Sequence, residues 1–503
     1  MKNIRNFLSE IIFILVSISY IYSEETGPNI RTAISQKSLD IIKNNLIPSY
    51  LNETTIDLKD LIIKQHIDFI GTIKLNITNN KLRFDKINPD QIEVLLMENS
   101  TINLNVKDMH GVIDFNYTFK SGFDDRKGTG NVTLKNLQIV VSSRVYAHPN
   151  IPEPKKLGPI FKIENIDLIS AEVEIKFNDM GKIEKLVQYL VANIQTAFFT
   201  LIKNQLSGEF LTKIDETLFN KMVNMPLFID IPNANLTIDY SLTKSPEVKN
   251  KYLELSLNAA IMSRANNISY TGTSVSVPEF SYGVDSIVTY INDYVIQSAL
   301  YTLFNQNKLD VFINSEKVPI LTTFTLGVAI PELYEHYQST KPVDISLDAK
   351  DYPKIGFNVN KTKINADYTA DFVVKMNETY SERALVLDTK VLADFNLFLS
   401  AGKIKVVLNE IKLDQIAVQY SIIGEVKSDV LATNLNNLIF SFKKVIETSI
   451  NDELSKFVIP SIAGISFEKS SLLEEEGYVQ LKVEMDPVVK SKTIEEKQIK
   501  FLE

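Results

Sequence analysis

The chain has 503 residues, of which 45% are hydrophobic and 23% charged, and it contains no cysteine. This length exceeds what one hydrophobic core normally organises and predicts two large domains, while the missing cysteine excludes disulfides, thiolate nucleophiles and the commonest zinc ligands. The formal net charge of −9 excludes the strongly positive field of a nucleic-acid binder.

Residues 1–23 have the pattern of a secretory signal peptide. Lys2 and Arg5 form a basic start, an apolar run over residues 11–22 follows, and Ser23 offers a small residue for cleavage. The run is too short to span a bilayer, although an uncleaved membrane anchor stays an alternative. We therefore expect a protein that is secreted or resides in the lumen of the secretory pathway.

Nine Asn-X-Ser/Thr sequons would make an exported form of this chain a glycoprotein. They begin at Asn52, Asn76, Asn99, Asn116, Asn131, Asn235, Asn267, Asn360 and Asn377. Because the chain is rich in asparagine, some sequons arise by chance, and we expect only part of them to be modified.

Short segments that alternate apolar and polar residues fill residues 54–146 and again residues 321–425. Ile102, Leu104 and Val106 alternate with polar neighbours, and Ile404 and Val406 do the same in the second region. A period of two is typical of half-buried antiparallel strands. Each region is therefore predicted to form an antiparallel sheet with one apolar face.

Helical periodicity appears in the same order in both halves. A short helix is expected near residues 35–46 and a long one over residues 182–220, and their counterparts are expected at 284–304 and 432–457. This order predicts an internal repeat of architecture. Polar stretches at residues 243–250 and 271–278 mark the join between the halves.

Three motifs stand out along the chain. They are "IRTAISQKSLDII" at residues 30–42, "LTIDYSL" at residues 236–242 and "SYGVDSIVTYINDYVIQSALYTLF" at residues 281–304. Together they resemble the family of bactericidal/permeability-increasing protein, lipopolysaccharide-binding protein and the plasma lipid transfer proteins. The first is similar to the family's opening, where a short strand leads into Ser-Gln-Lys and the first helix, and the last resembles the helix that opens the family's second barrel.

The resemblance implies an α+β boomerang of two elongated, strongly twisted antiparallel β-barrels, each wrapped on a long helix and joined by a central β-sheet. The first barrel would cover residues 24–225, the central sheet and linker 226–280, and the second barrel with its return strands 281–503. Each barrel would enclose the acyl chains of a bound phospholipid, with no other cofactor. The partners expected are phospholipids or related amphipathic lipids and, transiently, a membrane or lipid-particle surface. The protein is expected to be a monomer.

Two departures from the family pattern are visible. Members of the family typically carry a disulfide that would tie a strand near Ile163 to the long helix near Gly208, but this chain has no cysteine. Loss of such a disulfide costs about 2–5 kcal/mol of stability, so packing between that strand and helix must replace it. Antibacterial relatives carry a lysine-rich tip, but residues 120–130 here sum to only +1. Capture of lipopolysaccharide at a membrane-surface tip is therefore an alternative function, and its candidate residues are Lys120, Arg126, Lys127, Lys155 and Lys156.

Candidate lipid-contact residues are the apolar positions of the helical stripes and of the two family-like openings. In the first barrel they are Ile34, Leu39, Ile42, Leu46, Val187, Leu190, Val191, Ile194 and Phe198. In the second barrel they are Ile287, Ile291, Tyr294, Val295, Leu438, Phe442, Val445 and Ile446. For each residue, ordinary core packing is the competing interpretation.

Catalysis is not expected. The histidines His66, His110, His148 and His336 show no metal-ligand spacing, and no nucleophile elbow, phosphate-binding loop or dinucleotide motif is present. A third class of function is a structural secreted glycoprotein whose cavities are filled, with Phe198, Phe199 and Phe442 as candidate plugs. The volume of the interior separates this interpretation from lipid binding.

Overall fold

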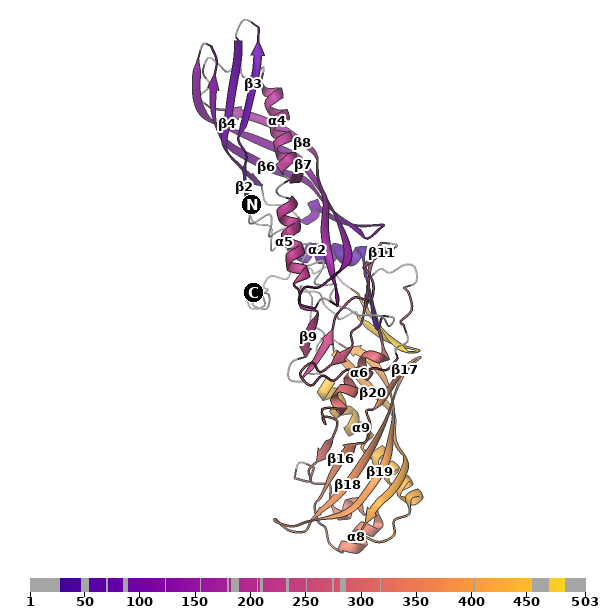
Figure 1. The fold of residues 1–503 in the computed structure, drawn as a ribbon. Coiled ribbons are helices and arrows are strands. Elements are labelled where there is room, and N and C mark those ends of the chain that lie inside the picture. The colour runs from indigo at the N-terminus through magenta and orange to yellow at the C-terminus, as the bar shows by residue number, and fades with distance from the viewer. Residues whose placement is uncertain are drawn as a thin grey trace.

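The computed structural model describes residues 28–484 apart from 47–53, 69–70, 85–88, 123, 154, 179–180, 182–189, 206, 209–210, 232–234, 250, 274–275, 281–285, 317, 401–402 and 455–469. The molecule is elongated, with a large sheet at each end and a third sheet between them (Figure 1). The predicted signal peptide lies outside the described residues.

The first sheet has seven antiparallel strands in the order β2-β4-β6-β7-β8, with β3 and β5 paired to β4 and β6. Its strands are β2 Thr54–Leu58, β3 Leu61–Ile67, β4 Gly71–Phe84, β5 Ile92–Met97, β6 Thr101–Lys120, β7 Asp125–Pro149 and β8 Leu157–Phe177, with a 3-10 turn, η2, at Pro89–Gln91. Along β6 every second residue is buried over most of its length. The predicted alternation is therefore confirmed, and one face of this sheet lines a core.

The second large sheet has the order β15-β16-β18-β19-β20, with β17 paired to β18. Its elements are β15 Val311–Ile313, β16 Val343–Ala349, β17 Lys354–Asn358, β18 Lys361–Lys375, β19 Ser381–Ser400 and β20 Lys403–Ser421, with helices α7 Thr323–Leu326, α8 Pro331–Tyr337 and α9 Ser428–Leu454. Helix α9 confirms the helix predicted at 432–457.

The expectation of closed barrels is wrong, because both large sheets are open within the described residues. The strand path ends at β2 and β8 in the first sheet and at β15 and β20 in the second, and these edges do not pair. Helices α4 Val191–Gln205 and α5 Leu211–Val223 cover the first gap (Figure 1). The boomerang shape stays a prediction.

Side chains of α4 and α5 bond to the backbone of both open edges. Gln205 donates to the carbonyl of Asp57 and accepts from the amide of Lys59, each at 3.2 Å, at the β2 edge. On the β8 edge, the carboxylate of Asp215 accepts from the amide of Ile163 at 2.8 Å. This bond ties the strand and helix that a disulfide joins in the family pattern.

Helix α9 seals the β20 edge in the same way. The carboxamide of Asn436 accepts from the amide of Leu413 at 2.7 Å and donates to its carbonyl at 2.9 Å. Asn451 pairs with both backbone groups of Val406 at 2.8 and 2.9 Å. A carboxamide presents the same donor and acceptor as a peptide group, so these asparagines replace a neighbouring strand.

Replacing Asn436 by Leu is therefore expected to lower the free energy of unfolding by about 1–3 kcal/mol, because the Leu413 amide and carbonyl lose their partners while half-buried. Urea denaturation and hydrogen exchange at the Leu413 amide measure the effect. Asn437→Leu is the matched control, because Asn437 is exposed on the same helix. Equal stability of the two variants would contradict the role assigned to Asn436.

The central sheet has six strands in the order β11-β12-β1-β14-β22-β21 and draws on both halves of the chain. Its strands are β1 Ile30–Ser35, β11 Glu247–Lys249, β12 Tyr252–Leu257, β14 Ile287–Asn292, β21 Ser471–Glu475 and β22 Tyr478–Val483. A small sheet of β9 Phe228–Ile231, β10 Leu236–Asp239 and β13 Ile261–Met262 lies beside α6 Asp293–Phe304.

The central sheet has a pseudo-twofold axis between β1 and β14. Thr32 pairs with Thr289, Ile30 with Ile291 and Ile34 with Ile287, and the two threonine hydroxyls lie 3.2 Å apart. The sequence Ile-X-Thr-X-Ile opens both strands, and Tyr-Leu-Glu-Leu in β12 corresponds to Tyr-Val-Gln-Leu in β22. The internal repeat predicted from the helices therefore extends to the residues at the join.

Two predicted helices differ from the structure. Residues 287–292 form strand β14 rather than the start of a helix, because the run Ile-Val-Thr-Tyr-Ile is β-branched and aromatic. The described part of the helix predicted at 182–220 is two helices, α4 and α5, with a π-helical turn at Ser207 and Gly208 between them. Helix α2 Gln36–Leu46 confirms the helix predicted at 35–46.

Candidate functional site

The first interior is the apolar core enclosed by the first sheet, α2, α4, α5 and one face of the central sheet. It contains five of the predicted lipid-contact residues: Ile34, Leu39, Leu190, Ile194 and Phe198. Val191 is half-buried. Val187 and the side chains of Ile42 and Leu46 lie outside the described residues. The structure therefore brings most of the predicted set into one core.

Aromatic rings fill part of this first interior. The ring of Phe115 lies 5.4 Å from that of Phe177 and 5.7 Å from that of Phe198, and Tyr117 lies 5.3 Å from Phe177. Phe115 and Tyr117 stand opposite Gly130 and Gly128 on β7, where an added Cβ atom would come within 2.5 Å of the Phe115 ring and 2.6 Å of the Tyr117 hydroxyl. These glycines make room for an aromatic cluster near the β6–β7 turn.

Three residues assigned to the second barrel belong to the first core instead. Ile287 is buried in it, and Ile291 and Val295 pack against it. The assignment was wrong because residues 287–292 form a strand of the central sheet, one face of which covers the first core. Tyr294 lies in a separate aromatic cluster, where its hydroxyl donates to the carbonyl of Tyr270 at 3.1 Å.

The second interior is the inner face of β18, β19 and β20 on the side of α9. Leu438 is half-buried and packs against the core of the second half, and Ile446 is also half-buried. The side chains of Phe442 and Val445 lie outside the description.

Strand residues that were not among the candidate lipid contacts form this inner face. They are Thr362, Ile364, Ala366, Val391, Ala393, Phe395, Leu397, Leu399, Ile404, Val406, Leu408, Ile411 and Leu413, which share one side of the sheet by their register. Their alternation, visible at Ile404, Val406 and Leu408, was the available signal.

The inner face of the second interior is not fully covered within the described residues. Val391, Leu397 and Ile404 on this face are only half-buried. Ala366 and Ala393 occupy inward positions with small side chains, and small inward residues leave room inside a curved sheet. The arrangement offers an apolar surface that folding does not fully bury.

The five predicted tip residues lie at two different ends of the first sheet, so their assignment to one surface was wrong. Lys120, Arg126 and Lys127 flank the β6–β7 turn, where Lys120 pairs with Asp125. Lys155 and Lys156 belong to the turn at the other end of the long strand β7, where Pro149 pairs with Leu157.

Lys156 also has a structural partner, because its ammonium lies 3.1 Å from the carboxylate of Asp239, whose side chain is fully buried. Burial raises the pKa of Asp239 even though Ser241, Lys156 and Asn258 oppose this shift. Arg126 is paired with Asp124 at 3.0 Å. The basic residues are therefore divided between the two ends and partly engaged.

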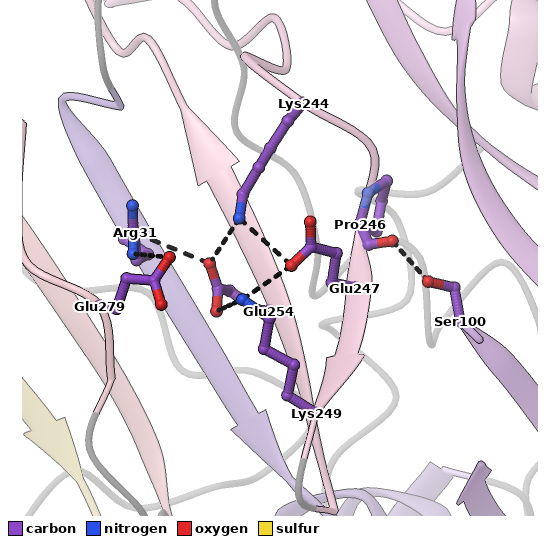
Figure 2. Close-up of polar contacts among 8 residues, drawn as sticks. All are labelled: Arg31, Ser100, Lys244, Pro246, Glu247, Lys249, Glu254 and Glu279. Carbon is purple, nitrogen blue, oxygen red and sulfur yellow. Dashed lines mark hydrogen bonds and ion pairs between the residues drawn. The ribbon is translucent and has the colours of Figure 1, made fainter. Parts of the chain in front are cut away.

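A cluster of charged side chains is built into one side of the central sheet (Figure 2). Glu254 on β12 is 1% exposed, and its carboxylate lies 3.1 Å from Lys244, 3.4 Å from Lys249 and 3.7 Å from Arg31. Glu247 lies 3.3 and 2.8 Å from the same two lysines. The pseudo-symmetric positions of Arg31 and Glu254 are the neutral Val288 and Gln480, so the fold does not require charge there.

The first sheet contacts the central sheet beside the charged cluster. The hydroxyl of Ser100, in the β5–β6 turn, donates to the carbonyl of Pro246 at 2.8 Å, directly before β11 (Figure 2). Arg31 lies 3.8 Å from Glu279 in the segment that crosses the sheet. The edge of the central sheet beside the cluster is therefore joined to the β5–β6 turn of the first large sheet.

The sequons differ in exposure. Asn99, Asn116, Asn235, Asn267, Asn360 and Asn377 are exposed, whereas Asn76 and Asn131 are half-buried. Asn52 lies outside the described residues. The exposed asparagines are accessible to N-glycosylation, and their glycosylation stays a prediction.

Within the described segments, no helix is long and apolar enough to cross a membrane. The same segments hold no group of three or more His, Asp or Glu side chains suited to a metal ion.

The protein contains two open antiparallel sheets, and helices complete each of them around an apolar interior. It therefore belongs to the class of proteins with extensive internal apolar surface. Residues 231–486 match the family model described as the LBP / BPI / CETP family, C-terminal domain. The chain belongs to this family, as its opening motifs indicated. Membership points to lipid binding or lipid transfer rather than to catalysis.

Individual relatives are distant. The chain is 24% identical to human BPI fold-containing family B member 4 over 173 residues and 24% identical to human BPI fold-containing family B member 6 over 286 residues. These matches cover 32% and 54% of this chain and span 28% and 60% of those proteins. A crystal structure of lipopolysaccharide binding protein aligns with 92% of this chain and 100% of that chain at 15% identity and a TM-score of 0.46.

Proposed function

We propose that this protein is a secreted carrier that encloses the acyl chains of phospholipids in its two interiors, one lipid in each. The observation that carries the proposal is the half-buried apolar face of β18–β20, with Ala366 and Ala393 at inward positions on the side of α9. In the first interior the aromatic cluster restricts a ligand to the part near the central sheet, around Ile34 and Leu39, because Leu190 lies beyond the cluster at the N-terminal end of α4.

The energetics favour an apolar interior as the main source of affinity. Burying each CH₂ group contributes about 0.8 kcal/mol, so two chains of about sixteen carbons gain roughly 25 kcal/mol before ordering costs. A site of this kind needs a few polar groups to select the head group rather than a cluster of charged ligands. The predicted helix residues and the strand residues of the second interior supply the apolar lining.

Two alternatives have their own observations. Capture of lipopolysaccharide rests on Lys120, Arg126 and Lys127 at the β6–β7 turn, all exposed. A structural role rests on the aromatic cluster, since filled interiors bind nothing. Competition between offered lipopolysaccharide and phospholipid separates the first alternative from the main proposal.

The test is to secrete the full chain from a eukaryotic host, determine its mature N-terminus and count bound lipids by native mass spectrometry. We expect cleavage after Ser23 and about two phospholipids per chain, one for each proposed interior. The double variant Ala366→Leu/Ala393→Leu should retain only the lipid of the first interior, because the added side chains fill the second. Ala417→Leu, at an exposed position of β20, is the matched control. A chain that carries no lipid and takes up none supports the structural role instead.

A further inference from the structure

Exposed apolar side chains gather on one segment of the second half, residues 318–334. Val318 is 36% exposed, Ile320 50%, Phe324 58%, Val328 73% and Tyr334 39%. We call these five residues the apolar tip. Helix α8, which carries Tyr334, lies at the end of the elongated molecule farthest from the first sheet (Figure 1). Large exposed apolar groups concentrated in one place mark an interaction surface.

The apolar tip is held outward by a rigid base. Helices α7 and α8 turn their other sides into the core of the second half, where Leu326, Ala329, Ile330 and Leu333 are buried. The side chain of Thr322 caps α7 by accepting from the amide of Thr325 at 3.1 Å. The pair of helices α7 and α8 therefore carries apolar side chains on both its inner and its outer side. The outer side chains stay exposed because the inner ones already fill the core.

Several further contacts fix the outer residues relative to one another. The rings of Phe324 and Tyr334 meet edge to face, with centroids 5.6 Å apart. An added Cβ atom on Gly327 would lie 2.7 Å from Tyr334, so the two helices are in close contact. The hydroxyl of Thr323 donates to the carbonyl of Ser339 at 2.6 Å. A preformed apolar surface binds without the entropic cost of ordering a loop.

The chemistry around the apolar tip fits a phospholipid surface. Residues 318–341 contain one lysine against two glutamates, a net charge of −1, so neither strong attraction nor strong repulsion of zwitterionic lipid is expected. Tyr337 and Tyr380 both donate to the carboxylate of Glu382, at 2.9 and 3.4 Å, and therefore lie beside the tip. Tyrosine is enriched at the level of lipid head groups because its ring is apolar and its hydroxyl is wet.

We propose that the apolar tip docks this protein on the surface of zwitterionic phospholipid membranes, with Phe324 and Val328 entering the acyl boundary. The basic β6–β7 turn, which belongs to the first sheet, is then not the main contact with the membrane. This inference rests on the proposed lipid-binding function for its choice of partner, and it deepens that function by naming the surface at which lipid is exchanged.

The first test uses fluorescence, because the chain contains no tryptophan. Phe324→Trp supplies a single reporter in the full secreted chain, and brominated phosphatidylcholine vesicles are expected to shift its emission to the blue and quench it. Phe440→Trp is the matched control, because Phe440 is 73% exposed on α9, and its emission should not change. Quenching at Phe440 without quenching at Phe324 would overturn the proposal.

The second test places a charge on the tip. Val328→Asp is expected to weaken binding to phosphatidylcholine vesicles at least about tenfold, because insertion strength scales with buried apolar area and a carboxylate resists burial. Val359→Asp, at another exposed valine (60%), is expected to bind as the unmodified chain does.

Bound phospholipid is counted in the same Val328→Asp sample. Lost docking with unchanged cargo supports the apolar tip independently of the interior, while unchanged docking overturns the tip and leaves the proposed function standing. A dimer that Val328→Asp converts to monomer, with no vesicle binding by either form, overturns the tip in favour of a second copy of this chain.

Discussion

Glu254→Gln is expected to lower the free energy of unfolding by about 3–5 kcal/mol, because it removes one partner from a buried ion pair and leaves Arg31 without its compensating charge. The Arg31 side chain is 8% exposed, so water cannot replace the lost carboxylate. Its other partner, Glu279, is 72% exposed and 3.8 Å away. Lys244 and Lys249 are each 33% exposed and can turn toward solvent, so the loss falls mainly on Arg31.

The pseudo-symmetry of the central sheet supplies the rescue. Arg31→Val/Glu254→Gln copies the neutral pair Val288 and Gln480 onto the charged half, and replacing a buried ion pair by packed neutral groups is often neutral or stabilising. We expect the double variant to return within about 1 kcal/mol of the original chain. Glu247→Gln is the control for a half-exposed member of the cluster and should cost about 1 kcal/mol or less. Chemical denaturation of all three variants measures these differences.

The outcome decides what the charged cluster is for. If the double variant is as unstable as Glu254→Gln, the charge is needed to hold the β5–β6 turn and the segment around Glu279 against the sheet. If it recovers, the ion pair adds little net stability, and its presence on one side only gives the two halves different attachments to a shared sheet. Hydrogen exchange in the β5–β6 turn distinguishes a loosened attachment from a general loss of stability.

Periodicity correctly predicted the strands and helices in which buried and exposed residues alternate regularly along the chain. The alternation through Ile102, Leu104 and Val106 and the stripe of α9 depend only on which face is buried. The strand at residues 287–292 was missed because an apolar run next to a helix is compatible with either period. Its β-branched composition was the better signal, and its partner β1 lies more than 250 positions away in the sequence.

Closure of the sheets could not be predicted from the sequence, because it depends on which edges meet in space. Asn436 and Asn451 look like ordinary polar positions of an amphipathic helix, and only the geometry shows that they pair with Leu413 and Val406. The same limit explains Lys155 and Lys156, which were grouped with the β6–β7 turn although the long strand β7 separates them. The resemblance supplied the class of function, while the difference between the two interiors came from packing.

Phe198→Ala is expected to lower the free energy of unfolding by about 3–5 kcal/mol, because it leaves a cavity in the aromatic cluster. Phe198 is fully buried, and its ring lies tilted against that of Phe115 with 5.7 Å between centroids. Phe199→Ala is the matched control at the next position of α4, where the side chain is only half-buried, and should cost clearly less. Urea denaturation of lipid-free protein measures both.

The same variant tests whether the aromatic cluster sets the length of the first interior. Removing the Phe198 ring should let longer acyl chains reach toward the β6–β7 turn, so the lipids that co-purify shift to longer chains while their number per protein stays unchanged. A ligand that binds the folded state at a hundred times its Kd adds about 2.7 kcal/mol, so offered long-chain phospholipid should restore most of the lost stability. An unchanged chain-length distribution, with stability that lipid does not restore, would show that the rings are core packing alone and that the first interior ends before them.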